Sequence, residues 1–111
     1  MYTAEFKVEV FIPEGYVDAM REQLNALGVL KVGDYDHVLS AAKVTGYWRP
    51  LEGANPHSGS VGEISCAPEC KLEFRCSGGL LQQTVEKIYE VHPYEEPVVN
   101  VLPLVDYRQI K

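Results

Sequence analysis

Residues 5–12, EFKVEVFI, followed directly by residues 13–28, PEGYVDAMREQLNALG, decide the fold of this chain. The first stretch alternates, which is typical of a strand with one buried face. Its core-facing residues are expected to be Phe6, Val8, Val10 and Ile12, opposite Glu5, Lys7 and Glu9. In the second stretch Pro13 favours a helix start and Gly28 a helix end. Apolar residues at spacings of three and four give that helix one apolar face: Val17, Met20, Leu24 and Leu27.

Two further extended segments follow this helix. A long strand over residues 36–48 is expected to bend at Gly46. Residues 49–60 contain two prolines and two glycines, which predicts a loop. The segment over residues 61–76 is expected to be interrupted at Ala67-Pro68, because proline lacks an amide hydrogen. Its second half alternates, so we expect four side chains to face the core: Cys70, Leu72, Phe74 and Cys76.

A second helix is predicted to open at residues 77–79 and to stop before Pro93, and a last strand covers residues 98–104. The apolar stripe of this second helix is expected to consist of Leu81, Val85, Ile88 and Tyr89. The order of elements predicts an α+β, ferredoxin-like βαββαβ sandwich. Right-handed crossovers place the first and third strands at the centre of an antiparallel sheet, with both helices on one face. One such domain accounts for residues 1–111.

Composition excludes several partner classes. With 16 acidic and 10 basic residues the net charge is -6, which disfavours nucleic acid. Apolar runs are far shorter than the roughly 20 residues of a membrane span, so no membrane partner is expected. The acidic N-terminal stretch lacks the pattern of a signal peptide, which predicts a cytoplasmic location.

The chain has three cysteines, an odd number, and it is large enough to fold without disulfides, so no disulfide framework is expected.

Two loop segments carry the chemistry-bearing side chains. Residues 46–59, GYWRPLEGANPHSG, and residues 92–97, HPYEEP, both combine aromatic, charged and conformationally stiff residues. Rigid loops of this kind are common places for binding sites. The alternative is that prolines and glycines shape the turns while the aromatic rings cover the end of the sheet.

These segments, together with GDYDH at residues 33–37 and with Glu63 and Glu73, resemble the domain inserted in bacterial Nif-three-like (NGG-one-interacting factor three-like) proteins. The chain looks like a free-standing version of that insert. The resemblance implies a fold similar to CutA and PII signalling proteins, whose subunits commonly form trimers. The family's dinuclear metal site lies in flanking lobes that have no counterpart here. This chain departs from the family pattern at Leu30, Trp48 and His57.

The favoured hypothesis is a non-catalytic, homo-oligomeric binding or regulatory module, most simply a homotrimer. Clefts between subunits would hold a neutral or cationic small molecule, because the loops supply aromatic walls and carboxylates. The candidate ligand-binding residues are Tyr35, His37, Trp48, Arg49, Asn55, Pro56, His57, Glu73, His92, Tyr94, Glu95 and Glu96. Alternatively, the same residues form the subunit contact, with Arg49 paired to Glu95 or Glu96. For Glu73, flanked by Lys71 and Arg75, a cross-strand ion pair is the competing interpretation.

Two other hypotheses stay open. A divalent transition metal such as zinc or copper, in the manner of CutA proteins, would be held by His57, His92, Glu95 and Cys66. An enzyme would use His92 beside Glu95 or Glu96 as general acid or base, or Cys66 beside His57 as nucleophile. Sequence spacing supports neither. His92 at a helix end is explained as well by hydrogen bonding, and Cys70 and Cys76 are expected to be buried and inert.

Overall fold

The structure, a computed structural model, describes residues 5–105. It confirms the predicted order of strands and helices. The elements are β1 (Glu5–Pro13), α1 (Val17–Ala26), β2 (Ser40–Trp48), β3 (Ser65–Ser77), α2 (Leu81–Val91) and β4 (Val99–Leu104). A single turn of 3-10 helix, Glu14–Tyr16 or Gly78–Leu80, leads into each α-helix. Gly28 has a positive φ of 85° just after α1, as expected of a glycine that ends a helix.

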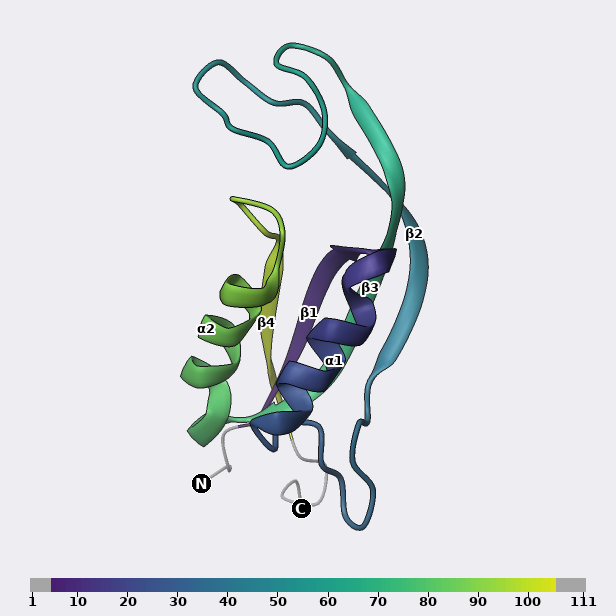
Figure 1. Cartoon of the computed structure of the whole chain (residues 1–111). Coiled ribbons are helices and arrows are strands. Elements are labelled where there is room, and N and C mark those ends of the chain that lie inside the picture. Colours follow the sequence, from purple (N-terminus) through teal and green to yellow (C-terminus); the bar gives the residue numbers. More distant parts are fainter. Residues whose placement is uncertain (1–4, 106–111) are drawn as a thin grey trace.

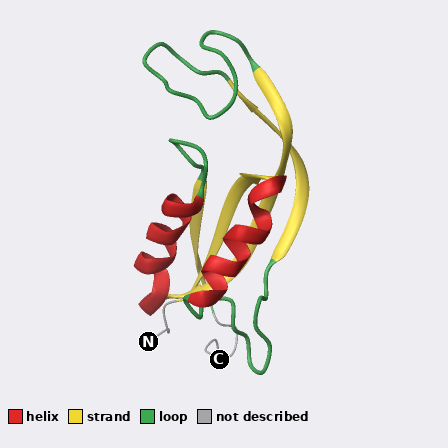
Figure 2. Cartoon of the chain, in the orientation of Figure 1, coloured by secondary structure: helices red, strands yellow, loops and turns green. Residues whose placement is uncertain are grey.

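The four strands form one sheet in the order β2-β3-β1-β4, and each neighbouring pair is antiparallel. The first and third strands are therefore central, as predicted. Both helices cover the same face of the sheet, and the other face carries no helix (Figures 1 and 2). Among the described residues no helix is long and apolar enough to cross a membrane.

The core lies between the sheet and the helices. Alternate residues of β1 and β3 point into it, and Met20, Leu24 and Ile88 of the helices meet them. The fully or almost fully buried strand side chains are Val8, Val10, Ile12, Cys70, Leu72, Phe74 and Cys76. This confirms the core face predicted for both strands. The stripe predicted for α2 is wrong at one position, because Tyr89 is exposed and Thr84 is buried, with its hydroxyl bonded to the Leu80 carbonyl oxygen.

β2 and β3 extend beyond the rest of the sheet as a long hairpin (Figure 1). Pairing between β1 and β3 ends where Pro13 lies opposite Glu69, whereas β2 and β3 stay paired to Trp48 and Ser65. The molecule is elongated as a result, with extents of 52 × 26 × 23 Å. Residues 49–64, the hairpin loop, connect the two strands and curl back over the top of the domain. This geometry brings the hairpin loop above the loop that follows α2.

The expected interruption at Ala67-Pro68 is wrong. The register between β2 and β3 runs without a bulge through Pro68, which lies opposite Thr45. At that point β3 has passed the end of β1 and has β2 as its only neighbour in the sheet. A proline is tolerated there because one side of the strand needs no ladder hydrogen bond.

The second and third strands in chain order, β2 and β3, both begin later than predicted. β2 begins at Ser40 instead of residue 36, because His37 has a positive φ of 55°. The His37 amide donates to Asn25 Oδ1 at 2.8 Å, which ties this turn to α1. β3 begins at Ser65 instead of residue 61, because residues 61–63 belong to the closing turn of the hairpin loop.

Candidate functional site

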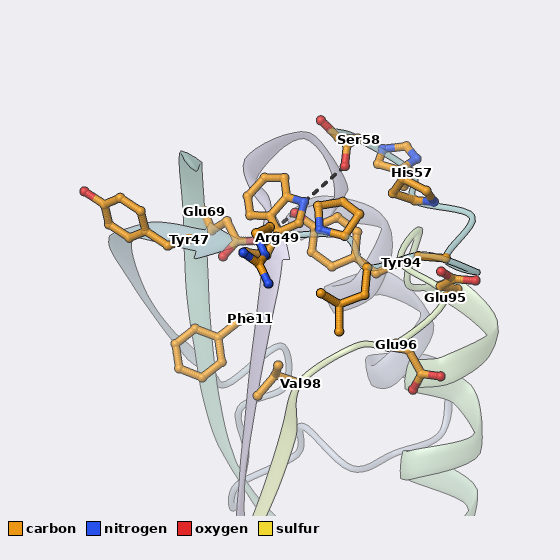
Figure 3. A pocket seen from close by; sticks show the side chains of 15 residues that line it. Phe11, Tyr47, Arg49, His57, Ser58, Glu69, Tyr94, Glu95, Glu96 and Val98 are labelled. Atoms are coloured by element: carbon orange, nitrogen blue, oxygen red, sulfur yellow. Dashed lines mark hydrogen bonds between the residues drawn. The ribbon is translucent and has the colours of Figure 1, made fainter. Parts of the chain in front are cut away.

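A pocket of about 380 Å³ lies where the hairpin loop meets the loop after α2 (Figure 3). The sheet supplies its inner wall, and the two loops supply the others. Its lining is largely aromatic and apolar, with four charged side chains and one histidine. The lining residues are Phe11, Tyr47, Trp48, Arg49, Pro50, Leu51, Ala54, Pro56, His57, Ser58, Glu69, Tyr94, Glu95, Glu96 and Val98. We call this cavity the loop pocket.

Tyr94 is held in the loop pocket by the buried imidazole of His92. The Tyr94 amide donates to His92 Nδ1 at 3.2 Å, so Nδ1 is the unprotonated ring nitrogen. His92 Nε2 then carries the hydrogen and donates to the Phe11 carbonyl oxygen at 2.6 Å. Burial lowers the pKa of His92, which favours this neutral form. The histidine therefore fastens the loop after α2 to the end of β1.

The Tyr94 side chain continues this connection to β3. Its hydroxyl donates to Glu69 Oε2 at 2.6 Å, although the two residues are 25 positions apart. Glu69 is 6% exposed, so this carboxylate is almost completely buried. Burial, reinforced by the bond to Glu69, raises the pKa of Tyr94, so the hydroxyl remains protonated and donating.

The absence of a side chain at Gly46 leaves the space that the Glu69 carboxylate occupies. The two lie on adjacent strands, and a Cβ at position 46 would overlap Glu69 Oε1. Any side chain there would displace the carboxylate. Gly46, the glycine that was expected to bend β2, permits a close approach between a side chain and a backbone.

Trp48 and the hairpin loop form the upper wall. Trp48 Nε1 donates to the Ser58 carbonyl oxygen at 3.1 Å, which folds the loop back onto its own strand. Gly59 has a φ of 97°, and a Cβ there would come within 2.6 Å of Ser65 Oγ and 3.1 Å of Trp48 Nε1. The ring centroids of Trp48 and Tyr94 are 6.1 Å apart, within the range of aromatic pairs.

A single hydrogen bond joins the two loops at the rim. The Asn55 amide donates to Glu95 Oε1 at 2.8 Å. Within residues 5–105, Arg49 forms no ion pair with either Glu95 or Glu96, so the pairing considered from the sequence is absent within one chain. The rim therefore presents an exposed guanidinium and exposed carboxylates whose charges are not neutralised by each other.

Comparisons with known proteins show which proteins this chain resembles. A GTP cyclohydrolase 1 type 2 homolog of Staphylococcus epidermidis is 34% identical over 99 residues, which are 89% of this chain and 27% of the relative. The corresponding Halalkalibacterium halodurans protein is 34% identical over 101 residues, 91% of this chain and 27% of the relative. A crystal structure of a Bacillus cereus protein related to NIF3 matches with a TM-score of 0.81 at 26% identity, over 96% of this chain and 27% of that chain. The chain is related to one segment of the NIF3-type proteins.

The chain spans about a quarter of the length of the curated NIF3-type relatives that it matches. The divalent cation tolerance protein CutA from Archaeoglobus fulgidus has a TM-score of 0.67 at 11% identity, over 90% of this chain and 83% of that chain. This likeness establishes a shared ferredoxin-like, CutA-like fold. No protein-family model matches the chain.

The structure brings together about half of the residues proposed for the site. Those that line the loop pocket are Trp48, Arg49, Pro56, His57, Tyr94, Glu95 and Glu96. Asn55 contributes its backbone to the bond between the loops, and His92 supports Tyr94 from behind. Tyr35 and His37 lie in the loop between α1 and β2, at the opposite end of the molecule (Figure 1). A shared site for all of these residues is therefore not formed within one chain.

Glu73 belongs to a separate charged ring on the helix-free face of the sheet. Glu73 Oε1 lies 2.6 Å from Lys7 Nζ and 3.4 Å from Lys71 Nζ, and Glu9 Oε2 lies 3.4 Å from each lysine. The hydrogen bond from Lys7 holds the pKa of Glu73 below its usual value. The cross-strand ion pair that was weighed against a ligand-binding role for Glu73 is thus confirmed.

The metal set proposed from the sequence is not assembled. Within residues 5–105, no group of three or more His, Cys, Asp or Glu side chains is close enough to hold a metal ion. Both ring nitrogens of His92 are already bonded, so this histidine has no lone pair to offer a metal. Cys66 lies on the outer part of β3 and does not line the loop pocket with His57 and Glu95. The pairings considered for catalysis, His92 with a glutamate and Cys66 with His57, are not formed either.

Sequence reasoning missed the inner wall of the loop pocket. Phe11, Glu69 and Val98 come from three different strands or strand ends, and their meeting depends on the sheet register. One signal was available for Glu69. A lone glycine inside a strand, here Gly46, often marks a close approach by another group, and Glu69 is that group.

Proposed function

We propose that this chain is a non-catalytic, homo-oligomeric module that binds a small ligand in the loop pocket. The observation that carries the proposal is the pocket itself. Its volume of about 380 Å³ suits a small molecule, and its lining combines aromatic walls with a few polar groups. Each wall is fastened by a named hydrogen bond, so the cavity is largely formed before a ligand arrives.

Exposed apolar side chains on the hairpin support self-association. Tyr47, Leu51, Val61 and Ile64 are all more than half exposed, and all lie on the extended hairpin or its loop. An assembly that covers the hairpin would bury these side chains. The sheet also has two open edges, β2 and β4. The CutA-like fold favours the homotrimer, in which the hairpin would reach a neighbouring subunit.

The arrangement of the candidate catalytic groups supports a role without chemistry. His92 uses both ring nitrogens structurally, and Cys66 does not line the loop pocket with His57. The three cysteines are free, which suits a reducing compartment, and we propose the cytoplasm.

Native mass spectrometry of protein purified without chelator tests the proposal. We expect a trimer that carries extra mass from a retained small molecule. An extra mass equal to a zinc or copper ion would favour the metal-binding alternative instead. A bare monomer would contradict both the assembly and the retained ligand.

A pair of variants locates the interface. Ile64→Asp, on the hairpin, is expected to shift the trimer toward monomer, because a buried carboxylate at an interface is unpaired. Val32→Asp is the matched control, since Val32 is also exposed but lies in the loop between α1 and β2 at the other end of the molecule. Equal effects of the two variants would argue against the hairpin as the interface.

A further inference from the structure

We infer that the ligand of the loop pocket is a small organic cation, an ammonium or guanidinium group on a flat or apolar body, anchored by Glu69. This inference rests on the proposed binding function and specifies the chemistry of the same pocket. One buried carboxylate, the aromatic rings around it and the balance of charge in the lining favour such a ligand.

Glu69 presents one free acceptor to the loop pocket. Its Oε2 accepts the Tyr94 hydroxyl, whereas no donor within residues 5–105 bonds its Oε1. Among the described residues, His37 Nδ1 is the only fully buried side-chain nitrogen or oxygen without a hydrogen-bond partner, so Glu69 Oε1 keeps some exposed surface. Glu69 is one of the residues that line the loop pocket. Figure 3 shows the Glu69 carboxylate turned from β3 toward Arg49 and Tyr94.

A largely buried carboxylate whose second oxygen has no protein donor leaves a hydrogen-bonding position that water or a ligand donor can fill. Glu69 is more than nine-tenths buried, and the absence of a side chain at Gly46 keeps it in this position. A ligand N–H, especially a charged one, would complete its hydrogen bonding. Charge-assisted bonds of this kind are about twice as strong as neutral ones.

The surrounding rings suit the same ligand class. Phe11, Trp48 and Tyr94 all line the loop pocket, and aromatic faces attract cations as well as flat apolar groups. A ligand with both features would use the carboxylate and the rings together.

The charge of the lining also favours a cation over an anion. Three carboxylates, Glu69, Glu95 and Glu96, face one guanidinium, that of Arg49. Arg49 is exposed and its charge is screened by water, whereas the Glu69 carboxylate is buried and acts at close range. An anionic ligand in the pocket would have to lie beside that buried negative charge.

Trp48 provides a direct readout, because it is the only tryptophan in the chain and it lines the loop pocket. Its fluorescence can be followed during titration with three probes of similar shape: 2-phenylethylamine, 2-phenylethanol and 3-phenylpropanoate. We expect the amine to bind at least about tenfold more tightly than the neutral and anionic probes, as one charge-assisted hydrogen bond would give.

Glu69→Gln is the diagnostic variant, because it keeps the shape and removes the charge. The preference for the amine over the alcohol should fall to less than about threefold, while binding of the alcohol stays unchanged. Glu63→Gln is the matched control, since Glu63 is exposed in the hairpin loop and does not line the pocket. If Glu69→Gln does not fold, the ranking of the three probes on the unaltered protein still decides whether the ligand is a cation. The double variant Glu95→Gln/Glu96→Gln then decides the anchor, because an amine preference that is lost in it assigns the cation to the rim and overturns the role of Glu69.

The outcomes separate this inference from the proposed function. Equal or tighter binding of the alcohol or of the carboxylate probe overturns the cation assignment but leaves a ligand-binding module. An amine preference that survives in Glu69→Gln assigns the cation to the rim carboxylates and overturns the role of Glu69. A probe set that leaves Trp48 unperturbed overturns the inference, while the retained mass in native spectrometry decides the proposed function independently.

Discussion

The Tyr94 hydroxyl donates a 2.6 Å hydrogen bond to Glu69 Oε2, and this bond connects the loop after α2 to the outer part of β3. Tyr94 is in turn held by His92, which bonds the Phe11 carbonyl oxygen at the end of β1. One short series of hydrogen bonds therefore positions the inner wall of the loop pocket. The residues in this series contribute differently to the free energy of unfolding, and substitutions can separate their contributions.

Tyr94→Phe removes the donor and keeps the ring. The Glu69 carboxylate then loses its bonded partner while still buried, so we expect the free energy of unfolding to fall by about 1–3 kcal/mol. Chemical denaturation with a two-state fit measures this change. Tyr89→Phe is the matched control, because Tyr89 is 53% exposed on α2, and it should change stability by less than about 0.5 kcal/mol. An equal loss in both variants would show that the bond to Glu69 contributes nothing specific.

Gly46→Ala tests the close approach of Glu69 to β2. The new Cβ would overlap Glu69 Oε1, so the carboxylate must move, and we expect a loss of about 1–3 kcal/mol. Gly79→Ala is the control, because a Cβ there meets no atom within 4 Å and its φ is ordinary, and it should be neutral or slightly stabilising.

The double variant Gly46→Ala/Tyr94→Phe sharpens this test. Both changes act on the position of one carboxylate, so their combined cost should be smaller than the sum of the single costs. Strict additivity would mean that alanine at position 46 destabilises the protein by a route other than Glu69.

The fold was predictable because local patterns and chain order agree. Alternation in β1 and in the second half of β3 marked the core faces, and the βαββαβ order then fixed the central strands. Errors occurred where a tertiary neighbour overrides a local rule. Pro68 does not interrupt β3, because β1 ends one position earlier in the register, opposite Glu69. No local window of sequence contains that information.

The candidate site was predictable in its loops and not in its inner wall. Trp48, His57 and Tyr94 stand in segments whose composition is unusual for connections, so composition alone indicated them. Glu69 follows a proline in a strand and resembles any solvent-facing strand residue. Its burial arises because the hairpin carries it beneath the loop after α2, and that depends on strand length and on the path of a 16-residue connection.

His92 predicts a pH dependence of stability. Burial lowers its pKa in the folded protein below the ordinary value of 6.5, so the unfolded chain binds the proton more readily. Stability from this group is complete above about pH 6.5 and is lost as the pH falls from there toward the lowered pKa. The slope for one proton is at most about 1.4 kcal/mol per pH unit.

Urea denaturation between pH 7.5 and 5 measures this slope in the unaltered protein and in His92→Gln. The variant should be less stable at pH 7.5 and should lose less stability on acidification, since His37, His57 and all carboxylates are the same in both. Parallel curves would show that His92 is not the titrating group.

The three cysteines should react in two classes. Cys66 is exposed, whereas Cys70 and Cys76 are buried and burial raises the pKa of both thiols. Because the thiolate is the reactive form and needs access to the reagent, iodoacetamide should add one label per folded chain and three per unfolded chain. The buried pair should react at least about 100-fold more slowly in the folded protein, at a rate set by opening of the core. Cys66→Ser should acquire no label on the same timescale, and a second rapid label in the folded state would contradict the core placement of β3.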